Sequence, residues 1–304
     1  MKHLIHIGYP KAGSTFLQRW FEQNPQLSFR GGGIAGFGSV FDVARTAALG
    51  KADVRYGVTS CENLSAPLAS AGAEFVDYAA DVLGPRERQR QACALLAGLF
   101  PDATVLIVTR GFASTILSNY SQYVRSGGPA PFEALVAHAA ASGGEDGDSL
   151  VSVEHWDYDA LIRDYEQAFG AGNVILLPYE LLRSDPSAFL AEIERRLGLD
   201  RFPAAAERVN AALSAAELAW YPRLSWAASR LRPRRLSRLY RRLAFAGRLG
   251  PLVRVLQRVK PLDPVTPAML PREVVERFRG RAERLGSEPL YAPYADEYLL
   301  ERFD

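Results

Sequence analysis

Apolar residues follow two alternating patterns along this chain. Unbroken apolar runs predict four strands, which begin near His3, Arg55, Ala103 and Asn173. Apolar residues at helical spacing predict helices in the segment opened by Leu17, Trp20 and Phe21, in residues 85–99, in residues 157–169 and in the segment with Phe189, Ile193 and Leu197. Alternating strands and helices predict an α/β fold. Because the strands read as continuously apolar, we expect a three-layer sandwich, with a central parallel sheet covered on both faces.

The first strand leads directly into a candidate anion-binding loop. Residues 9–15 read Tyr-Pro-Lys-Ala-Gly-Ser-Thr and precede the first predicted helix. The free N–H groups and the dipole of a helix N-terminus attract anions, and Lys11 adds a full positive charge. The hydroxyls of Ser14 and Thr15 add hydrogen-bond donors. The segment predicts a phosphate-binding loop, although a Walker A loop places its Lys after the second Gly, whereas Lys11 precedes Gly13.

Two further segments fit the same kind of ligand. Arg110 closes the third strand, and Ser118 lies two helical turns further along, so both side chains can reach one phosphate. The fourth strand is followed by Tyr-Glu-Leu-Leu at residues 179–182, then by Asp-Pro at 185–186 and Leu-Gly-Leu at 197–199. Phosphate ligands in open parallel sheets bind where these strands end.

In their order, these three blocks resemble sulfotransferases that use the sulfated nucleotide PAPS as donor, and we expect a bacterial member of that family. The resemblance implies a fold like that of P-loop nucleotide kinases, and 3′,5′-ADP as the product. It also implies a set of donor-binding residues, with Phe16 and Tyr179 beside the adenine: Lys11, Ala12, Gly13, Ser14, Thr15, Phe16, Arg110, Ser118 and Tyr179. The chain departs from the pattern at Gly111, where many members carry Asp or Asn, and it lacks an evident late Arg-Lys-Gly loop.

Lys11 and Glu62 are the candidate catalytic residues. Lys11 is placed to stabilise charge on the leaving phosphate. Glu62 follows the second strand, where family members hold the base that deprotonates the acceptor. His138 and His155 are weaker candidates for that base. His3 and His6 lie in the first strand, where a structural role is the simpler interpretation, and the family needs no metal.

One long segment is strongly basic. Residues 218–262, called here the basic segment, contain twelve Arg and Lys residues and no Asp or Glu. Part of it has helical amphipathic spacing, which suits an anionic membrane surface, an acidic substrate or an ordinary solvated helix. Residues 126–150 are rich in Gly, Pro and Ala and predict a lid over the acceptor, with a short helix near Phe132–His138. The last part of the chain predicts one helix, Pro271–Leu285, and a Tyr-rich tail packed on the domain.

Composition limits the remaining possibilities. The 304 residues are 48% hydrophobic and 23% charged, with a net charge of +2, which is typical of a globular protein and gives no reason to expect nucleic acid as a partner. Two cysteines make no disulfide framework, and no apolar run reaches the roughly 18–20 residues that span a bilayer. We therefore expect a single domain, 1–304, in the cytoplasm or at the inner membrane surface.

The acceptor stays open at this stage. A carbohydrate or a lipid-linked glycan is preferred because of the basic segment, and a small hydroxylated or aminated molecule is the alternative. Two other functions compete with sulfation. A P-loop nucleotide kinase is disfavoured by the position of Lys11 and by the absence of a carboxylate after Val108. A membrane-surface binding protein without activity would rest on the basic segment alone.

Overall fold

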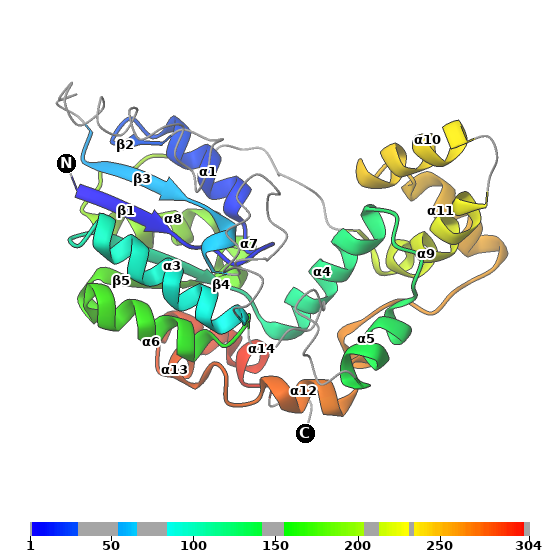
Figure 1. The fold of residues 1–304 in the computed structure, drawn as a ribbon. Helices are drawn as coiled ribbons and strands as arrows, with labels where there is room; N and C mark the ends of the chain where they lie inside the picture. Colours follow the sequence, from blue (N-terminus) through cyan, green and yellow to red (C-terminus); the bar gives the residue numbers. More distant parts are fainter. Residues whose placement is uncertain are drawn as a thin grey trace.

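Five parallel strands form the centre of the molecule (Figure 1). The structure is a computed structural model, and it describes residues 2–29, 54–65, 84–141, 155–203, 213–230 and 234–300. The strands are β1 (Lys2–His6), β2 (Leu27–Ser28), β3 (Tyr56–Ser60), β4 (Thr104–Thr109) and β5 (Val174–Pro178). Their order in the sheet is β2-β3-β1-β4-β5. Four of them are the predicted strands, and the two-residue β2 is too short for a pattern of apolar residues to reveal.

The register of the sheet brings the segments that follow the strands to one edge. The central strand β1 pairs with β3 and β4, and His6 lies opposite both Ser60 and Leu106. Val108 of β4 lies opposite Leu177 of β5. Because all strands are parallel, their carboxyl ends meet at this edge, and the predicted phosphate-binding segments meet there too.

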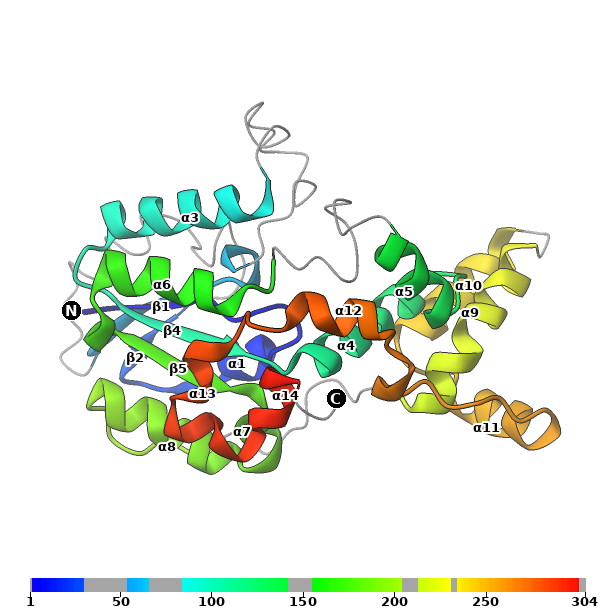
Figure 2. The same cartoon turned by 90° about the horizontal axis from the view of Figure 1, so that it is seen from below.

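Helices cover both faces of the sheet, which confirms the predicted three-layer α/β architecture (Figure 2). One face carries α3 (Pro85–Leu99) and α6 (Tyr158–Phe169). The other carries α1 (Ser14–Gln23), α7 (Tyr179–Ser184) and α8 (Pro186–Leu197). The helix ends follow their sequence signals. The Asp157 and Asp185 side chains cap the N-termini of α6 and α8, and Gly198 ends α8 with φ 67°.

A group of helices lies beyond the carboxyl edge of the sheet (Figures 1 and 2). The helix α4 (Phe112–Arg125) starts at that edge and runs outward, and α5 (Phe132–Ala141) follows it. The basic segment falls mostly on three helices, called here the outer helices: α9 (Ala215–Ser229), α10 (Arg234–Phe245) and α11 (Gly250–Val259). α9 and α10 pack on α4, and α11 packs on α9.

The C-terminal region differs from its prediction in one respect. The single helix predicted over Pro271–Leu285 is wrong, because the segment forms two helices, α12 (Arg272–Phe278) and α13 (Glu283–Gly286). Gly280 lies between them with φ 77°, a left-handed conformation that a continuing helix does not contain. The predicted packing of the Tyr-rich tail is confirmed, since Tyr291 and Tyr298 are buried between this region and the sheet edge.

Some expectations fall outside the described residues. The predicted lid is described only as far as residue 141, and there it contains α5, which includes the predicted short helix. Residues 142–150, like the glycine-rich loop at 30–39, are not among the described residues. Within the described ranges, no helix combines the length and the apolar character needed to cross a bilayer.

Candidate functional site

The loop after β1 turns tightly before α1 begins. The Ala12 N–H donates to the Tyr9 carbonyl at 3.0 Å, and Lys11 within this turn has φ 67°. Gly13 follows with φ 88° and forms the N-cap of α1. The Ala12 side chain is fully buried, so this predicted ligand contact contributes mainly to the shape of the loop. The turn leaves the N-terminus of α1 directed at the carboxyl edge of the sheet, where it favours an anion.

Arg110 connects this loop to the next strand. Its Nη1 donates to the Lys11 carbonyl oxygen at 2.7 Å, and its Nε donates to Ser114 Oγ at 2.8 Å. The guanidinium also lies over the Tyr179 ring, 4.6 Å from the centroid. Three segments that are distant in sequence therefore meet at one guanidinium group. They are the segments that follow β1, β4 and β5.

The start of α7 closes the other side of the loop. A Cβ atom built on Gly13 would lie 2.4 Å from Leu182 Cδ2 and 3.4 Å from Tyr179 Cδ2. The absence of a side chain at residue 13 lets Tyr179 pack against the loop. Phe16, on the first turn of α1, is partly buried against the core, and Thr15 beside it is exposed. The structure therefore brings Lys11, Gly13, Arg110 and Tyr179 together, as predicted from the sequence.

Ser118 is placed differently from the expectation that it pairs with Arg110. The guanidinium bonds Ser114, which lies one turn before Ser118 on α4. Residues four apart share a helix face, so Ser118 extends the line that runs from Arg110 through Ser114. Ser118 itself is half-buried. Sequence reasoning missed Ser114, and its four-residue spacing from Arg110 was the available signal.

A buried carboxylate fixes the backbone beside Arg110. Glu180 is 2% exposed, accepts the Gly111 N–H at 3.1 Å, and accepts the Tyr298 hydroxyl at 2.6 Å. Tyr291 and Thr109 continue this network through a 2.8 Å hydrogen bond between their hydroxyls. These contacts hold the corner between β4 and α4 in place. Sequence reasoning took Glu180 only as part of a motif and did not identify this role.

Steric crowding explains why residue 111 is a glycine. A Cβ atom built there would lie 2.7 Å from Glu297 Cβ and 3.0 Å from the Glu297 carbonyl oxygen. Glu297 belongs to α14 (Ala295–Leu299), which packs on α4. The departure from Asp or Asn at this position therefore follows from the close approach of the C-terminal helix.

Glu62 lies next to the loop, immediately after β3. It begins the short 3₁₀ helix η2 (Glu62–Leu64), and Ser65 then donates to the carbonyl oxygens of Gly8 at 3.0 Å and of Glu62 at 2.8 Å. Burial raises the pKa of the Glu62 carboxyl, while Ser14 and the Lys11 ammonium act in the opposite direction. The structure therefore brings Glu62 and Lys11 together.

The charge of Lys11 is itself perturbed. Burial lowers the pKa of the Lys11 ammonium, the Glu62 carboxylate acts against this shift, and the cations Arg125 and Arg110 add to it. Burial likewise lowers the pKa of Arg110. A cluster of cations that repel one another in a partly buried site gains stability when an anion with several negative charges binds.

The four histidines differ in their burial and in their hydrogen bonds. His3 and His6 lie in β1, where they bond Thr59 Oγ1 at 2.8 Å and Ser60 Oγ at 2.7 Å. Burial lowers the pKa of His3 to about 4 and that of His6 to about 3, so both are neutral in ordinary buffers. His138 lies on the exposed side of α5. His155 is buried before α6, and its carbonyl oxygen accepts Gln89 Nε2 at 3.0 Å.

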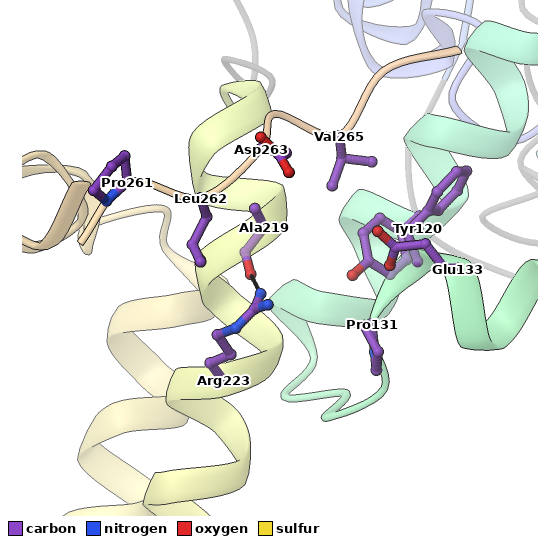
Figure 3. Close-up of a pocket in the computed structure, with 10 residues that line it drawn as sticks. Tyr120, Pro131, Glu133, Ala219, Arg223, Pro261, Leu262, Asp263 and Val265 are labelled. Atoms are coloured by element: carbon purple, nitrogen blue, oxygen red, sulfur yellow. Dashed lines mark hydrogen bonds between the residues drawn. The ribbon is translucent and has the colours of Figure 1, made fainter. Parts of the chain in front are cut away.

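A separate cavity of about 160 Å³ lies among α4, α5 and α9 (Figure 3). Figure 3 shows Glu133 and Asp263 beside it, with Arg223 bonded to the Ala219 carbonyl at 2.8 Å. Tyr120 forms part of its wall, on the same helix as Ser118. As for metals, the described parts of the chain contain no cluster of three or more His, Cys, Asp or Glu side chains suited to hold one.

Comparison with known proteins gives a match to a family model and distant structural likenesses, of which two are described here. Residues 88–204 match the model of the sulfotransferase family. A sulfotransferase from Alicyclobacillus acidocaldarius has a TM-score of 0.48 and 18% identity, over 84% of this chain and 96% of that chain. Mouse sulfotransferase SULT7A1 complexed with PAP has a TM-score of 0.35 and 15% identity, over 85% of this chain and 88% of that chain.

No curated protein sequence gives a match. The family match is therefore the main similarity in sequence. It spans α3 to α8 and includes Arg110, Ser118 and Tyr179, the second and third of the sequence blocks described above. Residues 88–204, less than half of the chain, are therefore similar to the sulfotransferase family.

Proposed function

We propose that this protein transfers the sulfuryl group of PAPS to a hydroxyl or amine of an acceptor. The observation that carries this proposal is the hydrogen bond from Arg110 to the Lys11 carbonyl. It joins the loop that suits a 5′-phosphosulfate to the residue that suits a 3′-phosphate. A donor with both groups would engage both segments at once.

Lys11 and the N-terminus of α1 act on the leaving group. When the bond between sulfur and the bridging oxygen breaks, negative charge grows on the 5′-phosphate of 3′,5′-ADP. Lys11, the first-turn N–H groups and the hydroxyls of Ser14 and Thr15 stabilise that charge. Groups already held in place cost little reorganisation at the moment of reaction, and removing one such donor typically costs about 10²–10³ in rate.

Arg110 and the serines of α4 bind the other end of the nucleotide. Arg110 offers donors in a planar fork, which suits a phosphate. Ser114 and Ser118 add hydroxyls along the same helix face. Phe16 and Tyr179 supply the aromatic surfaces for adenine. This arrangement distinguishes 3′-phosphorylated nucleotides from ATP.

Glu62 is the proposed base. Its carboxylate takes the proton from the acceptor oxygen or nitrogen as the new bond to sulfur forms. Burial raises its pKa, which makes it a better proton acceptor than an exposed carboxylate. Lys11 nearby acts against this rise and favours the ionised form. His138 and His155 lie on other elements, as described above.

The nucleotide-kinase alternative receives less support. A P-loop kinase needs a carboxylate at the end of a central strand to hold magnesium. Here β4 ends in Thr109, whose hydroxyl is engaged by Tyr291, and the following residue is Arg110. The acceptor is proposed to be a carbohydrate or a lipid-linked glycan, with a small molecule as the alternative, because the outer helices bring many arginines beyond the carboxyl edge of the sheet.

Thermal unfolding with nucleotides tests the donor proposal. A ligand at about 100 times its Kd adds roughly 2.7 kcal/mol to the stability of the native state. We expect 3′,5′-ADP to raise the midpoint, 5′-AMP and ATP to have little effect, and Arg110→Ala to abolish the difference. A response to ATP that exceeds the response to 3′,5′-ADP would support the kinase alternative. Equal responses to 3′,5′-ADP and 5′-AMP would exclude recognition of the 3′-phosphate.

A further inference from the structure

The helix α11 presents an apolar face to solvent. Leu252, Val255 and Val259 are spaced three and four residues apart, and so lie on one side of the helix. They are 46%, 57% and 80% exposed. The opposite side holds the helix in the protein: Val253 is buried, and Gln257 Oε1 accepts Trp220 Nε1 at 2.7 Å. The helix is therefore anchored on α9 by one side. Its opposite side is apolar and faces solvent.

The neighbouring helices α9 and α10 also carry exposed apolar side chains. Trp226 on α9 is 53% exposed, and Leu239 and Phe245 on α10 are 53% and 62% exposed. Of the large hydrophobic side chains exposed in the described part of the chain, six are on the outer helices and two, Leu95 and Leu99, are on α3. A surface with several exposed large apolar side chains commonly marks an interaction site.

Arginines surround these apolar side chains. Arg254 and Arg258 border the exposed face of α11. On the exposed side of α10, Arg238 and Arg242 lie, around the helix axis, between Leu239 and Phe245. The Arg230 guanidinium lies over the Trp226 ring, 3.3 Å from the centroid. Such side chains keep their charge at a polar interface while their stems cover apolar surface.

The charge of the chain is divided unevenly. The basic segment carries twelve positive charges and no acidic residue, whereas the rest of the chain has 24 basic and 34 acidic residues. The overall net charge of +2 conceals this separation. An anionic surface would attract the outer helices and repel the remainder, so it would also orient the molecule.

We propose that the outer helices dock on an anionic lipid membrane. Exposed aliphatic and aromatic side chains bordered by arginines are the pattern of helices that lie in a membrane interface. A soluble polyanion would use the arginines but would leave Leu252, Val255 and Val259 in water. The outer helices lie at the end of the molecule away from the sheet (Figures 1 and 2), so docking leaves the sheet and its helices outside the membrane.

The docking has a consequence for the acceptor, and this step rests on the proposed function. The helix α4 begins beside Arg110 and extends outward to α9 and α10. A docked protein would therefore hold the transfer site at the inner end of α4, which is about 21 Å long, with the outer helices between α4 and the membrane. Such a position suits an acceptor that is linked to a lipid.

Vesicle flotation tests the docking without any use of the transfer reaction. We expect the full chain to float with vesicles of phosphatidylcholine mixed with phosphatidylglycerol, and to remain unbound with phosphatidylcholine alone. Binding should weaken as salt is raised, because exposed charges are screened. No binding to the mixed vesicles, or equal binding to both kinds, would overturn the proposal.

Substitutions separate the contribution of the arginines to membrane binding from that of the apolar side chains. Arg254→Gln with Arg258→Gln should weaken binding about fivefold for each arginine. Leu252→Gln, Val255→Gln and Val259→Gln together should weaken it at least as much as the arginine pair. The matched control is Leu95→Gln with Leu99→Gln on α3, which removes exposed apolar groups elsewhere and should leave binding unchanged.

Two results would assign the surface differently. If the apolar triple variant binds the mixed vesicles as wild type does, the apolar face does not enter the membrane. If the protein binds heparin but not the vesicles, the surface serves a soluble polyanion. The response to 3′,5′-ADP is measured on each variant, so a failure of docking is distinguished from a failure of the proposed donor site.

Discussion

The Arg110 guanidinium donates a hydrogen bond to the carbonyl oxygen of Lys11, with 2.7 Å between Nη1 and the oxygen. This contact joins residues that are 99 positions apart and that were assigned separately to the two ends of one nucleotide. Lys11 adopts a left-handed backbone conformation, with φ 67°, and the contact acts on that peptide unit. The two halves of the proposed donor site are therefore held together by a direct hydrogen bond.

The first prediction concerns this shared role. Arg110→Lys keeps the positive charge but loses the planar fork that reaches both Ser114 and the Lys11 carbonyl. Because hydrogen bonds to charged groups contribute about 1.5–3 kcal/mol, we expect the affinity for 3′,5′-ADP to fall tenfold or more. Isothermal calorimetry measures it. Ser118→Ala is the comparison, and it should lose less because Arg110 bonds Ser114 instead. A greater loss in Ser118→Ala would reverse this ranking.

The second prediction uses the backbone of Lys11. A residue with a Cβ atom in the left-handed region is strained by about 1 kcal/mol, and glycine is not. Lys11→Gly should therefore be more stable than Lys11→Ala by about that amount, although both lose the charge and the activity. Urea unfolding of the two variants gives the comparison. Equal stabilities would mean that the turn relaxes when the side chain is removed.

The third prediction concerns the pH dependence of Glu62. Its pKa in the folded protein is raised, so the native state disfavours the ionised form, and the stability linked to this group is lost as pH rises through the folded pKa. Glu62→Gln should be more stable than wild type at neutral pH and nearly equal to it below the ordinary pKa of 4.5. Thermal unfolding across this range measures the difference.

Glu62→Gln also separates the two roles of the residue. As a base, Glu62 is needed for turnover and not for donor binding, so kcat should fall while the affinity for 3′,5′-ADP is kept. Loss of both would identify Glu62 as a residue that maintains the loop.

The fourth prediction tests the steric reason for Gly111. Gly111→Ala places a Cβ atom 2.7 Å from Glu297 Cβ, and should destabilise the protein by about 1–3 kcal/mol. Gly98→Ala is the matched control, because Gly98 lies in α3 and a Cβ there meets no atom within 4 Å. That substitution should be neutral or stabilise by about 0.5–1 kcal/mol. Denaturant titration of both variants measures the change in stability. Equal effects would exclude the Glu297 contact as the cause.

The fifth prediction is loss of stability in acid from the histidines of β1. Their folded pKa values are lowered, so stability present above pH 6.5 is lost as pH falls towards about 4 for His3 and about 3 for His6. For His3 the full effect is about 3 kcal/mol, at 1.36 kcal/mol for each pH unit of the shift. His3→Gln removes one of the two titrations and should reduce the slope of stability against pH over this range, and an unchanged slope would contradict the assignment.

Local patterns determined most of the framework of this protein. The strands β1, β3, β4 and β5 are continuous apolar runs, and α6 and α8 have both periodic apolar faces and capping residues, so neighbouring residues suffice to specify them. The loop at residues 9–15 and Arg110 follow in the same way, because parallel strands deliver their C-terminal residues to one edge. Pro271–Leu285 shows the limit, since its apolar periodicity continued past Gly280 while the chain turned there.

Contacts between distant residues were decided only by the tertiary structure. The choice of Ser114 over Ser118, the buried Glu180 beneath Gly111 and the approach of Glu297 depend on how α4, α7 and α14 pack together. The outward face of α11 is a further case, because the sequence left open what the amphipathic part of the basic segment faces, and Leu252, Val255 and Val259 are exposed in the fold. Periodicity identifies that a helix has an apolar side, whereas the packing of the whole chain decides whether that side meets protein or solvent.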